Sequence, residues 1–286
     1  MNQIPTARRL LCLIFVLQCT SGIGFSKVEW KPLPKDSIQR IAFGSCAKQW
    51  QAQPIWDAII NEAPDLWLFL GDNIYADTDG RTAWTVSKGQ LQGEWNRLAD
   101  KPEFQRAASA FPMMATWDNH DYGSYSGGAE FALKADSKEV FLSFFSEPKS
   151  SPRWKRSGIY DSKIIGHGAR SVQVILLDMK YNRNPFKVNP ASKEVRLKSG
   201  KVGKYLADST PEKTHLGKEQ WEWLETELRK PATLRLICSS TQIIPNEKGM
   251  DEWGNFPLER QRLFDLINHT KANGVIILSG NVHYTE

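Results

Sequence analysis

Short apolar runs alternate with helical patterns along most of this chain, from Ile38 onward. The run Leu66 to Leu70 holds five consecutive apolar residues, which is typical of a strand buried on both faces. Residues 217–229 instead show the spacing of an amphipathic helix. Because strands that alternate with helices form parallel sheets covered by helices, the sequence predicts an α/β fold.

The individual elements can be placed from these patterns. Strands are expected at residues 41–43, 66–70, 112–116, 158–165, 171–177, 234–238 and 275–278. Helices are expected at residues 52–62, 88–108, 130–145, 217–229 and 257–271. The strands 158–165 and 171–177 are joined by Gly166-His167-Gly168, which indicates a hairpin. Residues 180–215 lack periodicity and carry nine Lys and Arg against three acids, so they are expected to form a long, mobile basic loop.

The N-terminus has the pattern of a secretory signal peptide. Arg8 and Arg9 precede the apolar run Leu10 to Leu17, and small or polar residues follow. That run is far shorter than the roughly 20 residues that span a bilayer, so no stable membrane span is expected in the mature chain. An uncleaved interfacial anchor is the alternative. The expected boundaries are a signal peptide at residues 1–24, a linker at residues 25–37 and a mature N-terminus between Ser21 and Lys27.

This leader predicts export, whether to the periplasm, the cell surface, the extracellular space or the secretory pathway.

Composition and charge exclude several other classes of protein. With 41% hydrophobic residues, 20 Gly and 15 Pro, the chain is neither a collagen, a coiled coil nor mainly disordered. The formal charge is 37 − 32 = +5, and losing the two leader arginines leaves about +3, too little to predict nucleic-acid binding. Beyond the leader only Cys46 and Cys238 remain, so no disulfide scaffold is implied.

Polar side chains follow the predicted strands at the points where the strands end. They are Cys46, Asp72, the run Asp118-Asn119-His120-Asp121, Asp178 and the run Asn281-Val282-His283. Because the carboxyl ends of parallel strands meet at one edge of a sheet, we expect these residues to lie in one crevice. Carboxylate, amide, imidazole and thiolate donors suit transition-metal ions, and the oxygen donors also suit Ca²⁺. The sequence therefore predicts a metal site at this edge.

Several of these residues belong to motifs whose order resembles that of a known family. The motifs are Gly44-Ser45-Cys46, residues 69–77 (FLGDNIYAD), residues 117–121 (WDNHD), Leu177-Asp178 and residues 280–283 (GNVH). Residues 38–286 resemble the PhoD-like alkaline phosphatases, a branch of the calcineurin-like metallophosphoesterases. The resemblance implies a metallophosphoesterase domain with a four-layer αββα sandwich, the metallophosphatase fold. Because the family fold continues with further strands after the position of His283, we expect this domain to be truncated at its C-terminal end.

The same resemblance implies a binuclear or multinuclear metal site. One metal would be held by Cys46, Asp72, Tyr75 and His283, and a second by Asp72, Asn119 and Asn281. A trivalent ion acidifies thiol and phenol ligands, so Fe³⁺ is expected at the first position, with Ca²⁺ or another divalent cation beside it. We expect Cys46 to be a ligand rather than half of a disulfide with Cys238.

The expected catalytic residues are His120, Asp118 and Arg183. His120 matches the family histidine that contacts the phosphoryl group or the leaving oxygen, and Asp118 would orient its loop or add an oxygen ligand. Lys180 and Arg183 follow the strand that ends before Asp178, and as nearby cations they are expected to bind phosphoryl oxygens. A solvated loop is an equally open interpretation for both.

These features predict an exported metal-dependent phosphatase or phosphodiesterase that hydrolyses a small phosphorylated substrate through a metal-activated hydroxide. The alternative is a non-catalytic homologue that binds a phosphorylated ligand, because Asn281 stands where the family usually has Asp. A nucleic-acid partner is not expected, because the basic segment 180–215 holds only three aromatic residues. Neither the choice between monoester and diester nor the oligomeric state follows from the sequence.

Overall fold

The computed structural model describes residue 24 and residues 26–283. The predicted signal peptide lies outside these residues except for Gly24. Residues 26–37, expected to be a linker, form no helix or strand, but the ring of Trp30 packs edge-on against Phe104 and Phe144. In the part of the chain that is described, no helix is both long and apolar enough to cross a membrane.

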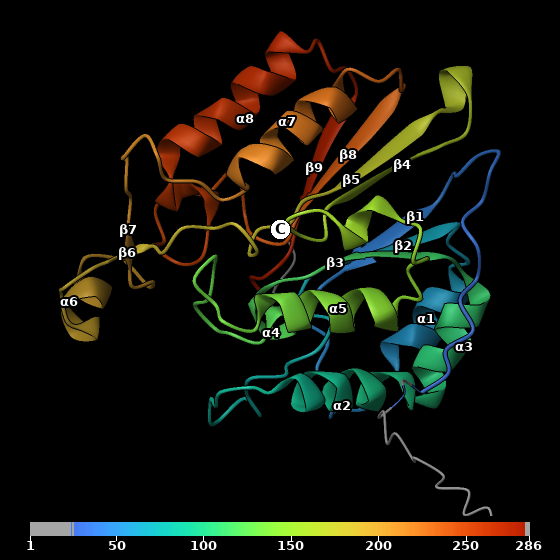
Figure 1. Ribbon diagram of the computed structural model, residues 1–286, viewed down its shortest axis with the longest axis horizontal. Coiled ribbons are helices and arrows are strands. Elements are labelled where there is room, and N and C mark those ends of the chain that lie inside the picture. The colour runs from blue at the N-terminus through green and yellow to red at the C-terminus, as the bar shows by residue number, and fades with distance from the viewer. Residues whose placement is uncertain (1–23, 25, 284–286) are drawn as a thin grey trace, which may run out of the picture.

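The first sheet is parallel and has the strand order β1-β2-β3. Its strands are β1 (Ile41–Gly44), β2 (Leu66–Leu70) and β3 (Met113–Thr116). Its outer face is covered by α1 (Ile55–Asn61), α2 (Lys88–Ala99), α3 (Pro102–Ala110) and α5 (Lys134–Phe144) (Figure 1). Trp67 and Phe69 of β2 pack edge-on against Trp56 of α1, so this layer is held by a cluster of large aromatic rings.

The second sheet has the strand order β4-β5-β8-β9. Its strands are β4 (Asp161–Ile165), β5 (Val172–Leu176), β8 (Leu234–Ser239) and β9 (Val275–Ser279). The strands β4 and β5 are antiparallel, which confirms the predicted hairpin, and the other pairs are parallel. The helices α7 (Gly217–Leu228) and α8 (Pro257–His269) cover the outer face, where Trp221 and Leu263 pack with Ile237.

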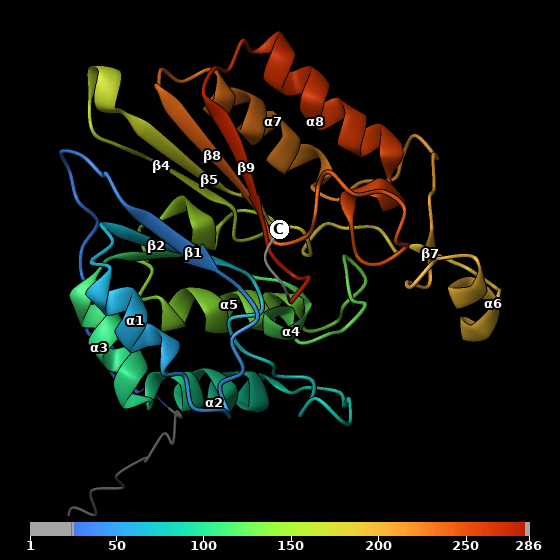
Figure 2. The same ribbon diagram turned by 180° about the vertical axis from the view of Figure 1, so that it is seen from behind.

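The two sheets pack against each other through their inner faces. Side chains alternate across a strand, so Leu66, Leu68 and Leu70 face away from the helices that cover Trp67 and Phe69. These leucines share a buried cluster with residues of the second sheet, including Val174, Leu176 and Leu236. The order of layers is therefore helices, sheet, sheet, helices, as both views show (Figures 1 and 2). This is the predicted four-layer αββα sandwich.

Two expectations about secondary structure are wrong. Residues 88–108 form two helices, α2 and α3, because Pro102 lacks an N–H and starts a new helix at its first position. Residues 180–215 are not one unstructured loop. They contain β6 (Lys187–Val188), α6 (Lys193–Lys198) and β7 (Tyr205–Leu206), with β6 and β7 paired in a small antiparallel sheet. These elements are too short to leave a periodic signal in the sequence.

The remaining elements are short. A four-residue helix, α4 (Asn119–Tyr122), follows β3. Three 3₁₀ turns lie at Pro152–Trp154, Gly168–Arg170 and Trp253–Asn255. All of them lie in connections between the larger elements.

The strand ends of both sheets meet where the sheets join. Thr116, at the end of β3, donates its hydroxyl to the carbonyl oxygen of Leu177, after β5, at 2.6 Å. Gly71, after β2, has φ +95°, and a Cβ there would lie 2.7 Å from Cβ of Asp118 and 2.9 Å from Cβ of Ser240. Only glycine fits this close approach. The polar residues that follow these strands are thus brought to one place.

Candidate metal centre at the strand ends

Cys46, Asp72 and His283 form the centre of the site. The thiol sulfur, a carboxylate oxygen and a ring nitrogen of these residues lie within 4.8 Å of one another. Tyr75 lies beside them, with its hydroxyl oxygen 3.0 Å from Nε2 of His283. The four residues expected to hold one metal are therefore together, although they come from three separate segments of the chain. Cys46 and Cys238 are both free thiols, so no disulfide joins them.

The site opens onto a cavity of about 950 Å³ between the edges of β1 and β9. Cys46 and His283 line it, together with Phe43 of β1 and Leu278 of β9. A cavity of this size admits a small organic ligand. The thiol and the imidazole are therefore accessible to a small molecule from solvent.

The backbone carries strain at the expected ligands. Cys46, Asp72, Asn281 and His283 have φ values of +64°, +51°, +77° and +59°. This left-handed conformation costs roughly 1–2 kcal/mol for most residues with a side chain and less for Asn and Asp. The other non-glycine residues with positive φ in the described ranges are Ala63, Ser146 and Lys271, each of which lies just after the C-terminus of a helix. Strain outside helix ends is concentrated at the expected ligands, which is typical of functional sites.

Without a bound cation, the acidic side chains of the centre are disfavoured in their deprotonated, negatively charged forms. Burial, together with Asp72, raises the pKa of the Cys46 thiol to about 12. Burial and the neighbouring Asp118 raise the pKa of Asp72 well above its usual range, and burial and Asp72 raise the pKa of Tyr75. A cation bound among these groups would lower each of these pKa values, because it favours the deprotonated form of its ligands. The donor set therefore fits a metal ion.

The helix α4 carries Asn119 and His120 to the site. The carboxylate of Asp121 accepts the backbone N–H groups of Asn73 at 2.8 Å and of Asp118 at 2.9 Å, which fixes the loop before α4 against the loop after β2. The backbone N–H of His120 donates to Oδ1 of Asp72 at 3.3 Å. The expected phosphate-contacting histidine is thus held directly beside the expected bridging carboxylate.

The side chain of His120 has a carboxylate partner. Its Nδ1 lies 2.5 Å from Oδ1 of Asp77, and its ring stacks on Tyr75 with 4.2 Å between centroids. Burial alone lowers the pKa of His120, but the hydrogen bond to Asp77 and the charge of Asp72 outweigh it, so the pKa is raised. The ring is therefore fixed, and Nε2 is the nitrogen left for another partner.

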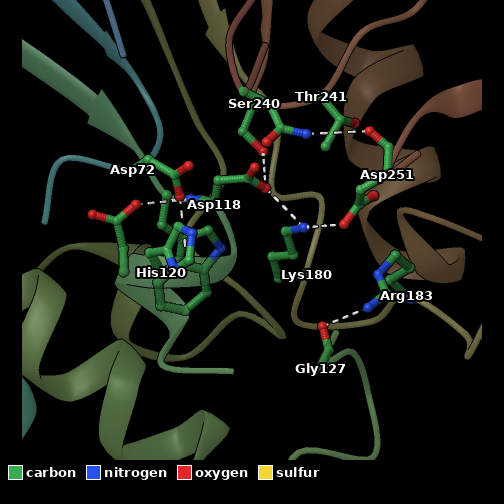
Figure 3. A network of polar contacts seen from close by, with 12 residues as sticks. Asp72, Asp118, His120, Gly127, Lys180, Arg183, Ser240, Thr241 and Asp251 are labelled. Carbon is green, nitrogen blue, oxygen red and sulfur yellow. Dashed lines mark hydrogen bonds and ion pairs between the residues drawn. The ribbon is translucent and has the colours of Figure 1, made fainter. Parts of the chain in front are cut away.

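A buried charge network lies behind this centre (Figure 3). Nζ of Lys180 lies 2.8 Å from Oδ1 of Asp118 and 2.6 Å from Oδ2 of Asp251. The hydroxyl of Ser240 donates to the same oxygen of Asp118 at 2.9 Å. Burial lowers the pKa of Lys180, but Asp118 and Asp251 outweigh it and raise that pKa. The backbone carbonyl oxygen of Asp251 accepts the amide N–H of Asn281 at 3.3 Å, so the network reaches the expected second metal position.

The positions of Lys180 and Arg183 differ from those expected for phosphate-binding cations. Both residues are fully buried, and the ammonium of Lys180 already pairs with two carboxylates. The guanidinium of Arg183 donates to the backbone carbonyl oxygens of Ser126 at 2.7 Å, of Gly127 at 2.6 Å and of Asn184 at 2.9 Å. In this structure both side chains hold loops together, and neither is a solvated loop residue. Asp118 is likewise buried and supports the α4 loop from behind.

Replacing Lys180 with Met is expected to lower the free energy of unfolding by about 3 kcal/mol, because two buried carboxylates would lose their counter-charge. Urea unfolding followed by tryptophan fluorescence measures this loss. The matched control is Lys198→Met, which removes an exposed pair with Glu194 and should leave the midpoint unchanged. Equal unfolding midpoints for the two variants would show that the buried network does not contribute to the stability of the fold.

Two participants in the site were not predicted from the sequence. Asp77 lies within the motif of residues 69–77, five residues after Asp72. This position in the motif was the sequence feature that could have indicated a place in the site. Asp251 lies in a segment without helix or strand, and it reaches Lys180 across 71 positions of sequence, so no local pattern marks it.

The stacked sheets with ligand-type side chains at the strand ends define a protein of the metallophosphatase fold. A solved structure of PhoD superposes with a TM-score of 0.67 at 20% identity, over 88% of this chain and 52% of that chain. A purple acid phosphatase, PPD1 from yellow lupin (Lupinus luteus) seeds, gives a TM-score of 0.52 at 17% identity, over 88% of this chain and 39% of that one. Both comparisons confirm the predicted fold.

Sequence comparison identifies the family. The model of the PhoD-like phosphatases matches residues 41–286, and the chain belongs to this family. Alkaline phosphatase D of Bacillus subtilis (strain 168) is 24% identical over 295 aligned residues, which cover 90% of this chain and 48% of that protein. The chain thus spans about half the length of this curated relative and of the solved PhoD structure.

Proposed function

We propose that this chain is an exported, metal-dependent phosphatase or phosphodiesterase whose catalytic domain is formed by residues 38–286. The observation that carries the proposal is the convergence of Cys46, Asp72 and His283 within 4.8 Å, with Tyr75 in contact. Family membership supports phosphate-ester hydrolysis. Export is supported by the leader pattern of residues 1–24, with the mature N-terminus between Ser21 and Lys27.

The residues divide between two metal positions. Cys46, Asp72, Tyr75 and His283 would hold one ion, for which Fe³⁺ suits the thiolate and phenolate donors. Asp72, Asn119 and Asn281 would hold a second ion, for which Ca²⁺ or another divalent cation suits the oxygen donors. Bound metals in such a site supply charge that stabilises phosphoryl oxygens and lowers the pKa of an attacking water.

The protein's own groups complete the chemistry. His120, held by Asp77, would donate a hydrogen bond from Nε2 to a phosphoryl or leaving oxygen, which offsets the negative charge that develops there. The buried pair of Lys180 and Asp118 would keep α4, and with it His120, in place. The substrate is proposed to be a small phosphorylated molecule whose phosphoryl group binds at the metal centre beside His120.

Elemental analysis of the purified protein, combined with hydrolysis of 4-nitrophenyl phosphate and bis(4-nitrophenyl) phosphate, tests this function. We expect bound metal and turnover of at least one ester, and the ratio of the two rates assigns the monoester or diester class. Metal-loaded protein without turnover of either ester would instead favour a non-catalytic protein that binds a phosphorylated ligand.

Replacing Cys46 with Ser is expected to lower the metal content while leaving the fold intact, because the thiolate is lost but the shape of the side chain is kept. Elemental analysis and circular dichroism measure the two effects. Cys238→Ser is the control, since Cys238 lies in the cluster between the sheets, away from the centre, and its loss should affect stability only. Full metal content in the Cys46 variant would remove this residue from the ligand set.

A further inference from the structure

An exposed tyrosine lies next to His120, and a lysine without an acidic partner lies next to that tyrosine. The ring centroids of Tyr125 and His120 are 5.9 Å apart, and Tyr125 is 58% exposed. Nζ of Lys204 lies 5.4 Å from the ring centroid of Tyr125 and 5.3 Å from that of Tyr205. Within residues 24 and 26–283, no carboxylate forms an ion pair with Lys204. Neither Tyr125 nor Lys204 belongs to the expected metal ligands.

The loop that carries Tyr125 is held in place by a buried residue. The guanidinium of Arg183 donates to the carbonyl oxygens of Ser126 and Gly127, and the N–H of Ala129 donates to the carbonyl oxygen of Arg183 at 2.8 Å. The loop is also packed so closely that a Cβ on Gly128 would lie 2.2 Å from that oxygen. Tyr125 is therefore presented to solvent by a fixed loop.

The ribbon that carries Lys204 is anchored as firmly. Tyr205 packs against Phe186 with 4.8 Å between ring centroids, and both share a buried cluster with Phe256. The N–H of Tyr205 donates to the carbonyl oxygen of Gly249 at 2.8 Å. In both views the β6–β7 ribbon and the loop after α4 lie on the same side of the molecule (Figures 1 and 2). Successive contacts thus link His120 to Tyr125 and Tyr125 to Lys204.

We propose that Tyr125 and Lys204 form a leaving-group subsite, which selects phosphate esters whose leaving group carries an aromatic ring with a negatively charged substituent. The proposal rests on the proposed function, because it places the scissile phosphate at the metal centre and the leaving oxygen at His120. A group attached to that oxygen would pass Tyr125, whose exposed ring offers an apolar face for stacking. The ammonium of Lys204 then supplies the counter-charge for an anionic substituent.

Binding of two phosphonates to the metal-loaded protein tests this subsite by titration calorimetry. The probes are phenylphosphonate and 4-carboxyphenylphosphonate, which differ only in the carboxylate. Lys204→Met is expected to raise the Kd of the carboxylated probe roughly 3- to 10-fold and to leave that of phenylphosphonate unchanged. Lys204→Arg should keep wild-type binding of both. Lys201→Met, the same charge change at an exposed position of the same segment, is the control and should affect neither.

The tyrosine is tested with the same probes. Tyr125→Ala is expected to weaken both phosphonates and Tyr125→Phe neither, because the ring alone provides the stacking face. Equal effects of Lys204→Met on the two probes, or no effect, would overturn the subsite while leaving the phosphate site intact. If the wild type binds neither phosphonate and hydrolyses no ester, the proposed function itself is wrong, and the subsite with it.

Discussion

Replacing Asp72 with Ala is expected to remove both metals and to reduce phosphate-ester hydrolysis to the uncatalysed rate. The carboxylate of Asp72 lies within 4.8 Å of the donors of Cys46 and His283, and it also accepts the backbone N–H of His120. As the proposed bridge between two cations, it is the negative charge that screens their repulsion. Without it the two ions destabilise each other, so metal and activity should be lost together.

Elemental analysis and ester hydrolysis on the same preparation measure this result. Asp57→Ala is the matched control, because Asp57 is an exposed aspartate that pairs with Arg106 on the helical side of the first sheet. It should keep full metal content and full activity. An Asp72 variant that keeps both metals would show that this carboxylate does not bridge them.

Replacing His120 with Ala is expected to lower kcat by roughly 10²- to 10⁴-fold while leaving the metal content unchanged. The imidazole is proposed to donate to the reacting oxygens and not to ligate metal. Asp77→Asn should give a smaller loss of kcat, because it weakens the partner that orients the ring at Nδ1 without removing the ring. Turnover numbers at saturating ester, together with metal content, separate this outcome from the loss expected for Asp72→Ala.

The control for His120 is His167→Ala, since His167 is an exposed histidine in the turn between β4 and β5. It should turn over substrate like the wild type. If His120→Ala lost its metal as Asp72→Ala does, His120 would be a ligand. If it kept full activity, the reaction would take place elsewhere in the protein.

Much of the fold can be predicted from local pattern. The buried run of residues 66–70 and the amphipathic stretch of residues 217–229 have the lengths and periods of the β2 strand and the α7 helix. The common location of the polar residues can be predicted because they lie shortly after strands, and parallel strands end at a common edge. Their assignment as ligands comes from the resemblance to the PhoD-like family. Chain topology thus brings positions that are distant in sequence into one cluster, which is why the sequence alone is enough to place Cys46 beside His283.

Other features depend on contacts that a local pattern does not encode. Lys180 and Arg183 are two cations in a basic segment, and nothing nearby in sequence indicates that both are buried. Their burial depends on partners that are distant in sequence. These are Asp251 for Lys180, and the carbonyl oxygens of the loop at residues 126–127 for Arg183. The break between α2 and α3 is different, because Pro102 is a readable signal whose preference for the first turn of a helix marks the boundary.

The contact between Tyr75 and His283 joins positions 208 residues apart, and His283 follows the last strand of the described chain. A nascent or unfolded polypeptide therefore lacks the assembled site, because Tyr75 and His283 come together only when β9 has paired with β8. Binding of the proposed metal would then be coupled to global folding rather than to a local rearrangement. An ion at 100 times its Kd would add about 2.7 kcal/mol to the stability of the whole domain. With the proposed metal bound, resistance to heat or denaturant would rise with the concentration of free metal.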